Sequence, residues 1–309
     1  MRISVLVAED VFDTGLTSIL DTFETANELG GERRFDVKIA SSQPVVRTHH
    51  GLVVPVTPVP ARTDLVIVPA LACKLPATII AALERPAVVA LVEQVQRLAK
   101  RTRIAAACTG TFVLGRAGIL DGHRATTSWW LGPTFRQAFP TVELDESEML
   151  VADAKIITAG AALAHVDLAL AIIRERSPDL AATVARYLLV EDRPSQAPFV
   201  APSHVMYDDE LVKRFERWVR GHLRQSFDLA TAARAVGASE RTLQRRVRAV
   251  LGKPPISFVQ DLRLERAVHL LRVSSDSVDA IAGVVGYEDG STLRTLLRRK
   301  LNTSVRELR

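Results

Sequence analysis

Short apolar runs alternate with longer amphipathic segments over the first 190 residues of the chain. Continuous apolar runs of three to five residues predict strands buried on both faces, at residues 3–7, 35–39, 65–68, 104–107 and 156–158. Apolar positions at three- and four-residue steps predict helices over residues 16–29, 76–100, 111–120, 129–139 and 163–174. Strands separated by helices indicate an α/β doubly wound sandwich, in which helices cover both faces of a parallel sheet.

A proline-rich stretch then interrupts both patterns. Residues 191–203 carry three prolines at four-residue intervals and show neither helical nor strand periodicity, which is typical of an extended, fairly stiff connector. A chain of 309 residues is long enough for two domains. We therefore predict a first domain over residues 1–190, a linker over 191–211 and an all-α second domain over 212–309.

The second domain contains an internal repeat. Leu229, Ala233, Val236 and Gly237 recur 49 positions later as Val278, Ala282, Val285 and Gly286. Small apolar residues at helical spacing, followed by a glycine that tolerates a positive φ, predict a helix-turn-helix, with Ser239 capping the second helix. Phe258, Leu262, Leu270 and Leu271 predict a helix between the two units. Two helix-turn-helix units held rigidly apart can enter successive major grooves of one DNA duplex.

Charge is distributed unevenly between the two parts. Residues 213–309 carry 20 Lys and Arg against 10 Asp and Glu, a net charge of +10, whereas the rest of the chain carries −5 of the overall +5. A basic module joined to an acidic one favours binding to a polyanion. The outward positions of the first predicted reading helix include Arg241, Gln244, Arg245 and Arg248, whose side chains suit guanine and adenine edges or phosphates.

These motifs resemble the AraC/XylS-type DNA-binding domain. The resemblance covers about residues 212–309 and rests on the segments at 232–247, 262–267 and 281–289. The DNA-binding residues that it and the helix pattern indicate are Arg241, Gln244, Arg245, Arg248, Ser291, Thr292, Arg294, Thr295 and Arg298. The family usually has Arg where this chain has Thr295. Arg294 stands one position earlier and points about 100° away on an ideal helix, so base reading is expected mainly from the first unit.

A cysteine follows one of the predicted strands. Residues 104–112 give a strand, then Cys108 among small residues, then a helix, which is the arrangement of a nucleophile elbow. The helix start offers backbone N–H groups to an anion. A buried structural cysteine at a strand end is the alternative interpretation.

Further segments resemble the PfpI-like, class I glutamine-amidotransferase-like fold, which is flavodoxin-like. They lie at residues 64–69, 107–110, 117–122, 125–129 and 158–160, followed by Asp167. With its C-terminal module the whole chain is similar to GlxA-family AraC-type transcriptional regulators. Hydrolytic members of the wider superfamily need a base beside the thiol, commonly a His directly after the cysteine, where this chain has Thr109. In many regulators of this type a His stands where this chain has Ser128.

Without a positioned imidazole, covalent acyl chemistry lacks its proton shuttle, so we expect no enzyme activity. The same edge of the sheet suits a small-molecule effector, because ligands bind outside the carboxyl ends of parallel strands. The predicted ligand-binding residues are Asp13, Ala70, Cys108, Thr109 and Ser128.

The sequence thus predicts a one-component transcription regulator, expected to be an activator, that responds to a small metabolite and binds promoter or operator DNA as a homodimer. The alternatives are a cysteine-dependent amidase or hydrolase with an appended DNA-binding domain, and a nonspecific DNA binder. Two cysteines are too few for a disulfide framework or a structural zinc site, and we expect no metal and no cofactor. No apolar stretch approaches the ~18 residues of a membrane span, and Glu9 and Asp10 come too early for a signal peptide, so we expect a cytoplasmic protein.

Overall fold

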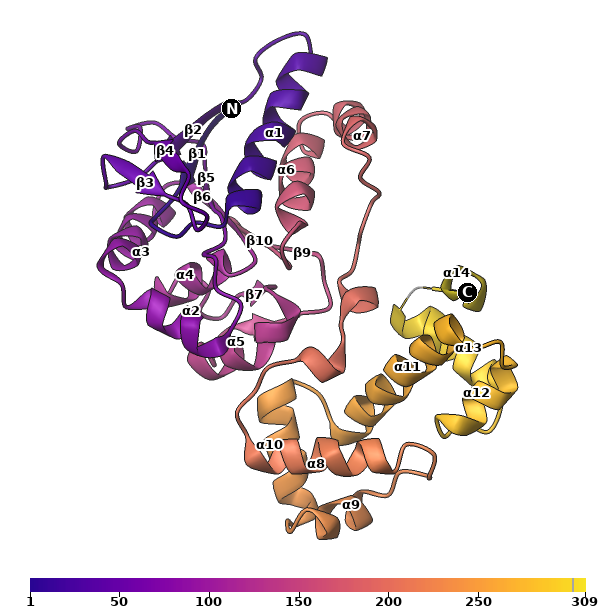
Figure 1. Cartoon of the computed structure of the whole chain (residues 1–309). Helices are drawn as coiled ribbons and strands as arrows, with labels where there is room; N and C mark the ends of the chain where they lie inside the picture. Colours follow the sequence, from indigo (N-terminus) through magenta and orange to yellow (C-terminus); the bar gives the residue numbers. More distant parts are fainter. Residues whose placement is uncertain (302) are drawn as a thin grey trace. The chain divides into compact units, whose positions relative to one another are not determined.

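The computed structural model describes residues 1–301 and 303–309, and the chain forms two compact units, Met1–Gln196 and Ala197–Arg309 (Figure 1). The expected linker over residues 191–211 is divided between these units. Residues up to Gln196 belong to the first, and the rest contributes two short 3₁₀ helices, η2 (Ala197–Phe199) and η3 (Pro202–His204), to the second.

A six-stranded sheet forms the centre of the first unit, in the order β2-β1-β5-β6-β10-β9. Its strands are β1 (Arg2–Leu6), β2 (Asp36–Ala40), β5 (Leu65–Val68), β6 (Arg103–Ala107), β9 (Leu150–Asp153) and β10 (Ile156–Ala159). The five predicted strands are confirmed to within one residue, and all five are parallel. Strand β9 was not predicted and runs antiparallel to β10, because Ala154 takes a φ of 53° and closes a tight hairpin with Lys155.

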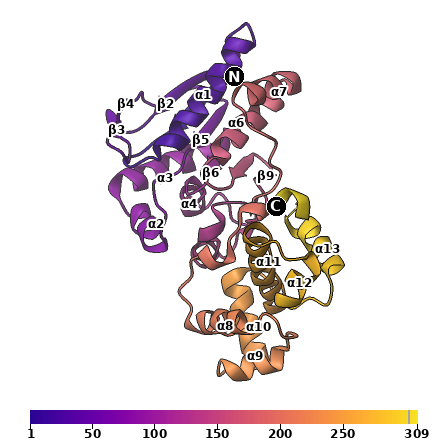
Figure 2. The same cartoon turned by 45° about the vertical axis from the view of Figure 1, so that its right-hand side comes forward.

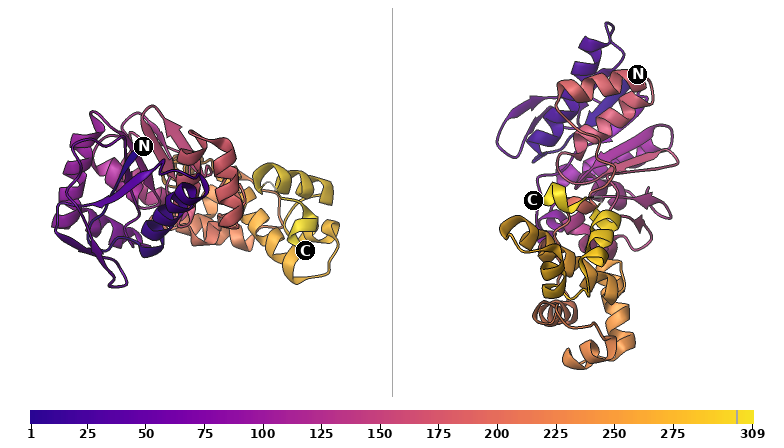
Figure 3. Two further views of the ribbon diagram at one scale, coloured as in Figure 1. Left: turned by 90° about the horizontal axis from the view of Figure 1, so that it is seen from above. Right: turned by 90° about the vertical axis from the view of Figure 1, so that its right-hand side faces the viewer.

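Helices cover both faces of this sheet, as the doubly wound prediction requires (Figures 2 and 3). One layer consists of α1 (Asp13–Leu29), α6 (Ala164–Arg174) and α7 (Pro178–Tyr187). The other layer consists of α2 (Pro76–Leu83), α3 (Pro86–Ala99), α4 (Gly110–Arg116) and α5 (Gly132–Ala138). The 3₁₀ helix η1 (Trp129–Leu131) directly precedes α5. Alternate residues of each strand enter opposite cores. Leu65 and Ile67 of β5 pack under α1 and α6, and Val66 and Val68 pack under α3 and α4.

The predicted helix over residues 76–100 is wrong as one element. It is broken between α2 and α3, where Arg85 is extended and Pro86 opens the second helix. A proline disfavours helical backbone at the residue before it and lacks the N–H that would continue the helix, so it starts a new one. Two small two-stranded sheets complete the unit. They are β3 (Val45–Arg47) with β4 (Val53–Pro55), and β7 (Arg124–Ala125) with β8 (Glu143–Leu144).

The second unit is helical throughout its described residues, as predicted. Its helices are α8 (Glu210–Gly221), α9 (Leu229–Ala235), α10 (Glu240–Leu251), α11 (Pro255–Val273), α12 (Val278–Val284), α13 (Gly290–Leu301) and α14 (Val305–Leu308). They form two apolar cores, one around α9 and α10 and one around α12 and α13. Helix α11 supplies Phe258 and Leu262 to the first core and Leu271 to the second, so the predicted connecting helix is confirmed. Over the part of the chain that the structure describes, every helix is too short or too polar to cross a bilayer.

Candidate functional site

Cys108 occupies a strained turn between β6 and α4. Its φ of 56° lies in the left-handed region that a residue with a side chain rarely adopts. A Cβ added at Gly110 would lie only 2.4 Å from the carbonyl oxygen of Val68, so the start of α4 passes directly over the end of β5. The predicted elbow geometry is therefore present, and small neighbours are what make it possible.

The thiol of Cys108 meets a hydroxyl in a buried pair. Cys108 Sγ lies 2.9 Å from Ser128 Oγ, and the Thr127 hydroxyl donates to the Cys108 carbonyl oxygen at 2.7 Å. Both hydroxyls are fully buried, and Cys108 is 6% exposed. Among the described residues, no imidazole or carboxylate hydrogen-bonds to the thiol. The structure thus brings two of the predicted ligand-binding residues, Cys108 and Ser128, into direct contact.

Thr109 and Ala70, two other predicted ligand-binding residues, follow the carboxyl ends of β6 and β5, and their polar groups already form hydrogen bonds within the protein. The Thr109 hydroxyl donates to the Leu71 carbonyl oxygen at 2.5 Å, which leaves only its backbone to face a ligand. The Ala70 N–H donates to His165 Nε2 at 3.1 Å, and the Ala70 carbonyl accepts from Phe12 N at 2.8 Å. The backbone of Ala70 is therefore held by the protein itself.

His165 is a structural histidine in this arrangement. Its Nε2 accepts from Ala70, so its Nδ1 carries the proton and donates to the Ala162 carbonyl. Complete burial lowers the pKa of His165 to about 4, and the hydrogen bond to Ala162 opposes this shift. The neutral ring locks the residues that follow β5 to the start of α6.

The predicted residue Asp13 opens α1 and interacts elsewhere. His50 Nδ1 lies 2.8 Å from Asp13 Oδ2. Burial raises the pKa of Asp13, but hydrogen bonds from Thr48 and His50 outweigh it, so the net shift is downward and the carboxylate stays charged. Described contacts of Asp13 do not include Cys108, and its link to the site runs through the neighbouring Phe12.

A charged pair that the sequence pattern does not indicate lies near the Cys73 thiol. Arg85, between α2 and α3, forms an ion pair with Asp10, which follows β1 and has a φ of 63°. The Arg85 Nε is buried and has no hydrogen-bond partner among the described residues. Burial raises the pKa of the Cys73 thiol, and the positive charge of Arg85 partly offsets this. Only the fold brings these residues, from three separate segments, together.

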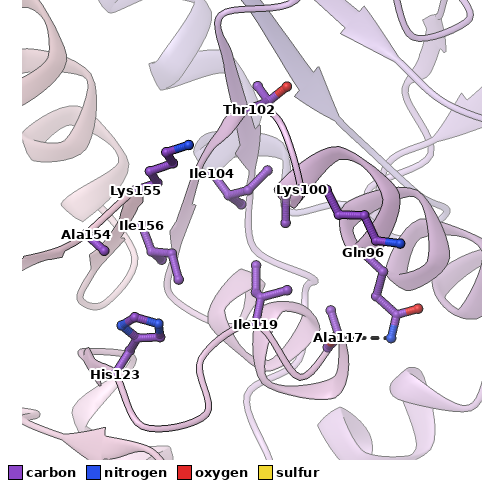
Figure 4. Close-up of a pocket in the computed structure, with 11 residues that line it drawn as sticks. Gln96, Lys100, Thr102, Ile104, Ala117, Ile119, His123, Ala154, Lys155 and Ile156 are labelled. Carbon is purple, nitrogen blue, oxygen red and sulfur yellow. Dashed lines mark hydrogen bonds between the residues drawn. The ribbon is translucent and has the colours of Figure 1, made fainter.

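A hollow of about 700 Å³ lies at the opposite edge of the sheet (Figure 4). Ile104 and Ile156, near the amino ends of β6 and β10, contribute to an apolar wall with Ile119. Lys100 and Lys155 border it, and neither forms an ion pair within the described part of the chain. Because Cys108 follows the carboxyl end of β6, this hollow is separate from the Cys108 site.

The first helix-turn-helix has the predicted construction. Gly237 takes a φ of 71° in the turn, and the Ser239 hydroxyl accepts from Thr242 N at the start of α10. The buried face of α10 is Leu243, Val247 and Leu251. Its exposed face includes the predicted Arg241, Gln244, Arg245 and Arg248, and none of these four side chains has a hydrogen-bond or ion-pair partner among the described residues. By contrast, Arg246 pairs with Asp209.

The second helix-turn-helix repeats this construction. The Asp289 carboxylate accepts from Thr292 N at 2.8 Å and caps the first turn of α13, whose buried side chains are Leu293 and Leu297. The predicted residues Ser291, Thr292, Arg294, Thr295 and Arg298 are all exposed. The Thr295 hydroxyl donates to the Ser291 carbonyl oxygen at 2.9 Å within the helix. Of this set, Arg294 and Arg298 present the positive charge.

One buried arginine of α11 contacts both helix-turn-helix units. Arg263 donates to the Gln225 carbonyl at 2.5 Å, in the loop before α9, and stacks with its guanidinium 5.4 Å from the ring centre of Tyr287. The partners of this guanidinium are thus a carbonyl oxygen and an aromatic ring. Burial lowers the pKa of Arg263, and burial raises the pKa of Tyr287 to about 12.

Two family models match this chain. Residues 1–175 match the DJ-1/PfpI family, and residues 232–309 match a helix-turn-helix domain. The transcriptional regulator CdhR of Pseudomonas aeruginosa is 30% identical over 201 residues, which are 63% of this chain and 59% of that protein. The regulator GlxA of Rhizobium meliloti is 28% identical over 212 residues, 67% of this chain and 65% of that protein. The regulator GbdR of Pseudomonas aeruginosa is 28% identical over 189 residues, 60% of this chain and 51% of that protein. The aligned part of the chain thus spans between half and two thirds of the length of these curated relatives.

Solved structures show the same fold for the first unit. An AraC family transcriptional regulator from Pseudomonas putida superposes with a TM-score of 0.50 at 21% identity, covering 60% of this chain and 98% of its own. A transcriptional regulator protein from Vibrio parahaemolyticus gives 0.52 at 21% identity, covering 61% and 98%. At this identity the likeness concerns the fold alone.

Proposed function

Since the chain belongs to the DJ-1/PfpI family and continues into a helix-turn-helix domain, we propose that it is a one-component transcription regulator. Its second unit binds promoter or operator DNA by sequence, and its first unit binds a small metabolite that changes DNA binding. The relatives named as transcriptional regulators support this proposal.

The observation that carries the proposal is the exposed face of α10. Arg241, Gln244 and Arg245 stand free on a helix whose other face is fully used for packing. Arginine pairs with guanine and glutamine with adenine in the major groove, so these residues are assigned to base edges. Arg248 and Arg298 are assigned to phosphates, which supply affinity without sequence preference.

The Cys108 site is assigned to the effector. Its thiol is paired with Ser128, and a serine hydroxyl does not accept a proton near neutral pH, so the pair can bind a ligand without a general base to drive turnover. Because Cys108 and Ser128 are nearly or fully buried, an effector must displace the segment that covers them. Binding is thereby tied to a local conformational change.

We further propose that the regulator acts as a homodimer, so that two copies of the second unit contact two half-sites. An effector that favours the DNA-competent arrangement must itself bind more tightly when operator DNA is present. Equal effector affinity with and without operator would remove this coupling.

The first experiment is DNA binding by the full-length chain. DNA upstream of its own and neighbouring genes is compared with scrambled DNA of equal length over a salt series. A specificity ratio of about 10³ or more is expected for a regulator. Equal affinity for both DNAs would favour the nonspecific binder, and hydrolysis that is lost in Cys108→Ala would favour the enzyme.

A screen for the effector then uses the operator found in this way. Ser128→Ala should weaken the response to an effector while DNA affinity in its absence is kept. Lys155→Gln, in the hollow at the other edge of the sheet, is the matched control and should respond normally. The reverse result would move the effector to that hollow.

A further inference from the structure

Gln196, the last residue of the first unit, is buried in a cage of oxygen atoms. Only 1% of it is exposed. Its Nε2 lies 3.1 to 3.2 Å from four oxygens, and its Oε1 accepts from Ala161 N at 2.8 Å. The four oxygens are Thr126 Oγ1 and the carbonyl oxygens of Thr127, Glu146 and Glu148. An amide is the group that fits, because one side of this cage accepts hydrogen bonds and the other donates one.

The segment that holds Gln196 is the one that contacts the cysteine. Thr127 presents its carbonyl oxygen to Gln196 and its hydroxyl to the Cys108 carbonyl. The next residue, Ser128, meets the Cys108 thiol. Thr127 therefore contacts both Cys108 and Gln196, and a shift of this segment must change both sets of contacts.

The backbone of Gln196 and of the residues just before it is docked as well. Gln196 N donates to the Ser147 carbonyl at 2.7 Å, and Met149 N donates to the Pro194 carbonyl at 3.2 Å. Gly160 makes the room for the side chain, because a Cβ at that position would lie 2.2 Å from Gln196 Cδ. The second unit begins with the next residue, Ala197. The point at which the connector leaves the first unit therefore depends on whether the Gln196 side chain occupies this cage.

We propose that Gln196 is the positioning residue through which the Cys108 site and the connector act on one another. This inference rests on the proposed effector role of that site. A ligand bound beside Cys108 displaces the segment containing Thr127, which opens the cage around the Gln196 amide. The Gln196 side chain then leaves the cage, and the backbone just before it detaches from the first unit. The connector then starts several residues earlier, which changes how freely the DNA-binding unit is held.

The first test uses iodoacetamide as the probe, since it adds a small amide group to Sγ of Cys108. Hydrogen–deuterium exchange of the full-length chain is measured before and after alkylation. The amides of Gln196, Ala161 and Met149, which form the docking hydrogen bonds, should exchange about tenfold faster once Cys108 is alkylated. Cys108→Ser treated in the same way, where only Cys73 reacts, is the control. Unchanged exchange at these three amides overturns the inference.

The second test works in the opposite direction. Gln196→Ala removes the amide, and Gly160→Ala expels it without altering it. Both variants should raise the alkylation rate of Cys108, followed by peptide mass spectrometry, about tenfold. Gln137→Ala, on an exposed position of α5, should match the wild type. A rate in Gln196→Ala equal to that of Gln137→Ala contradicts the proposal.

A third measurement separates positioning from general destabilisation. Alkylation of Cys108 should change the affinity of the wild-type chain for its selected DNA and leave that of Gln196→Ala unchanged, although Cys108 of the variant still reacts. An equal change in both proteins overturns the positioning role. If the wild-type chain shows no sequence preference for DNA, the proposed function fails, while the exchange experiment still decides whether Gln196 and Cys108 are coupled.

Discussion

The thiol of Cys108 and the hydroxyl of Ser128 form a buried contact of 2.9 Å at the carboxyl edge of the sheet. The left-handed backbone at Cys108 accompanies a thiol that points to the Ser128 hydroxyl, the position where many regulators of this type have a histidine. A hydroxyl there orients the sulfur and does not activate it. The elbow geometry is thus present with a hydroxyl beside the thiol, and a hydroxyl does not accept a proton near neutral pH.

Loss of this contact should have a modest energetic cost. Ser128→Ala leaves the Cys108 thiol without its partner, and we expect the free energy of unfolding of the first unit to fall by about 1 kcal/mol. Urea denaturation of the full-length chain, followed by tryptophan fluorescence, measures the change. Ser42→Ala, at an exposed position, is the control, and equal stability of the two variants would contradict the contact's role.

Gly110 should tolerate no side chain. In Gly110→Ala the new Cβ would lie 2.4 Å from one backbone oxygen and 2.7 Å from another, so α4 must move away from β5. We expect the free energy of unfolding to fall by about 2 kcal/mol or more, as happens when extra atoms are forced into a well-packed core. Gly283→Ala, on an exposed helical position with open space around it, should instead stabilise its unit by about 0.5 to 1 kcal/mol. Thermal unfolding of both variants checks the contrast in sign.

His165 should make the first unit acid-sensitive. Its pKa falls from the ordinary 6.5 to about 4 in the folded chain, so between these values the unfolded chain binds the extra proton. Stability is therefore complete above about pH 6.5 and declines by about 3 kcal/mol as the pH falls to 4. Urea midpoints between pH 4 and 7.5 should fall less steeply in His165→Gln than in the wild type. The exposed His49→Gln should behave like the wild type, and parallel profiles for all three proteins would refute this assignment.

Neighbouring arginines of α10 should differ in their effects on DNA. Arg241→Ala should weaken the binding free energy for specific DNA by about 1 to 3 kcal/mol. Arg248→Ala should reduce by about one the slope of the logarithm of the binding constant against the logarithm of the salt concentration. Arg246→Ala is the control, because Arg246 pairs with Asp209 inside the unit and should change stability more than the salt slope. Fluorescence anisotropy over a salt series distinguishes these cases. Equal losses from all three variants would contradict the assigned roles.

Arg263 should hold the two helix-turn-helix units in one arrangement. Arg263→Ala removes the hydrogen bond to Gln225 and the stacking on Tyr287. We therefore expect the free energy of unfolding of the second unit to fall by about 1 to 3 kcal/mol. Arg266→Ala, on the same helix, is the comparison. Denaturation of the full-length chain measures the difference, and an equal effect of both substitutions would argue against a special role for Arg263.

The strands and both helix-turn-helix units could be predicted because their signals are local. Continuous apolar runs mark the parallel strands, and the repeat of Ala233 and Gly237 at Ala282 and Gly286 marks the two units. The helix break before Pro86 was also indicated locally, by the proline itself, but the apolar periodicity across residues 76–100 outweighed that indication. The apolar pattern of strand β9 is weak, because this strand is short and partly exposed at the sheet edge.

The sequence by itself determined the order of the elements, their buried faces and the presence of Cys108 at a strand end. It also determined which side chains of α10 are left outside. Only the tertiary structure decided the polar partners. Gln196 meets Thr127 across 69 positions, and His165 meets Ala70 across 95. Burial periodicity is a property of neighbouring residues, whereas a buried polar group takes whichever partner the assembled sheet brings within hydrogen-bonding distance.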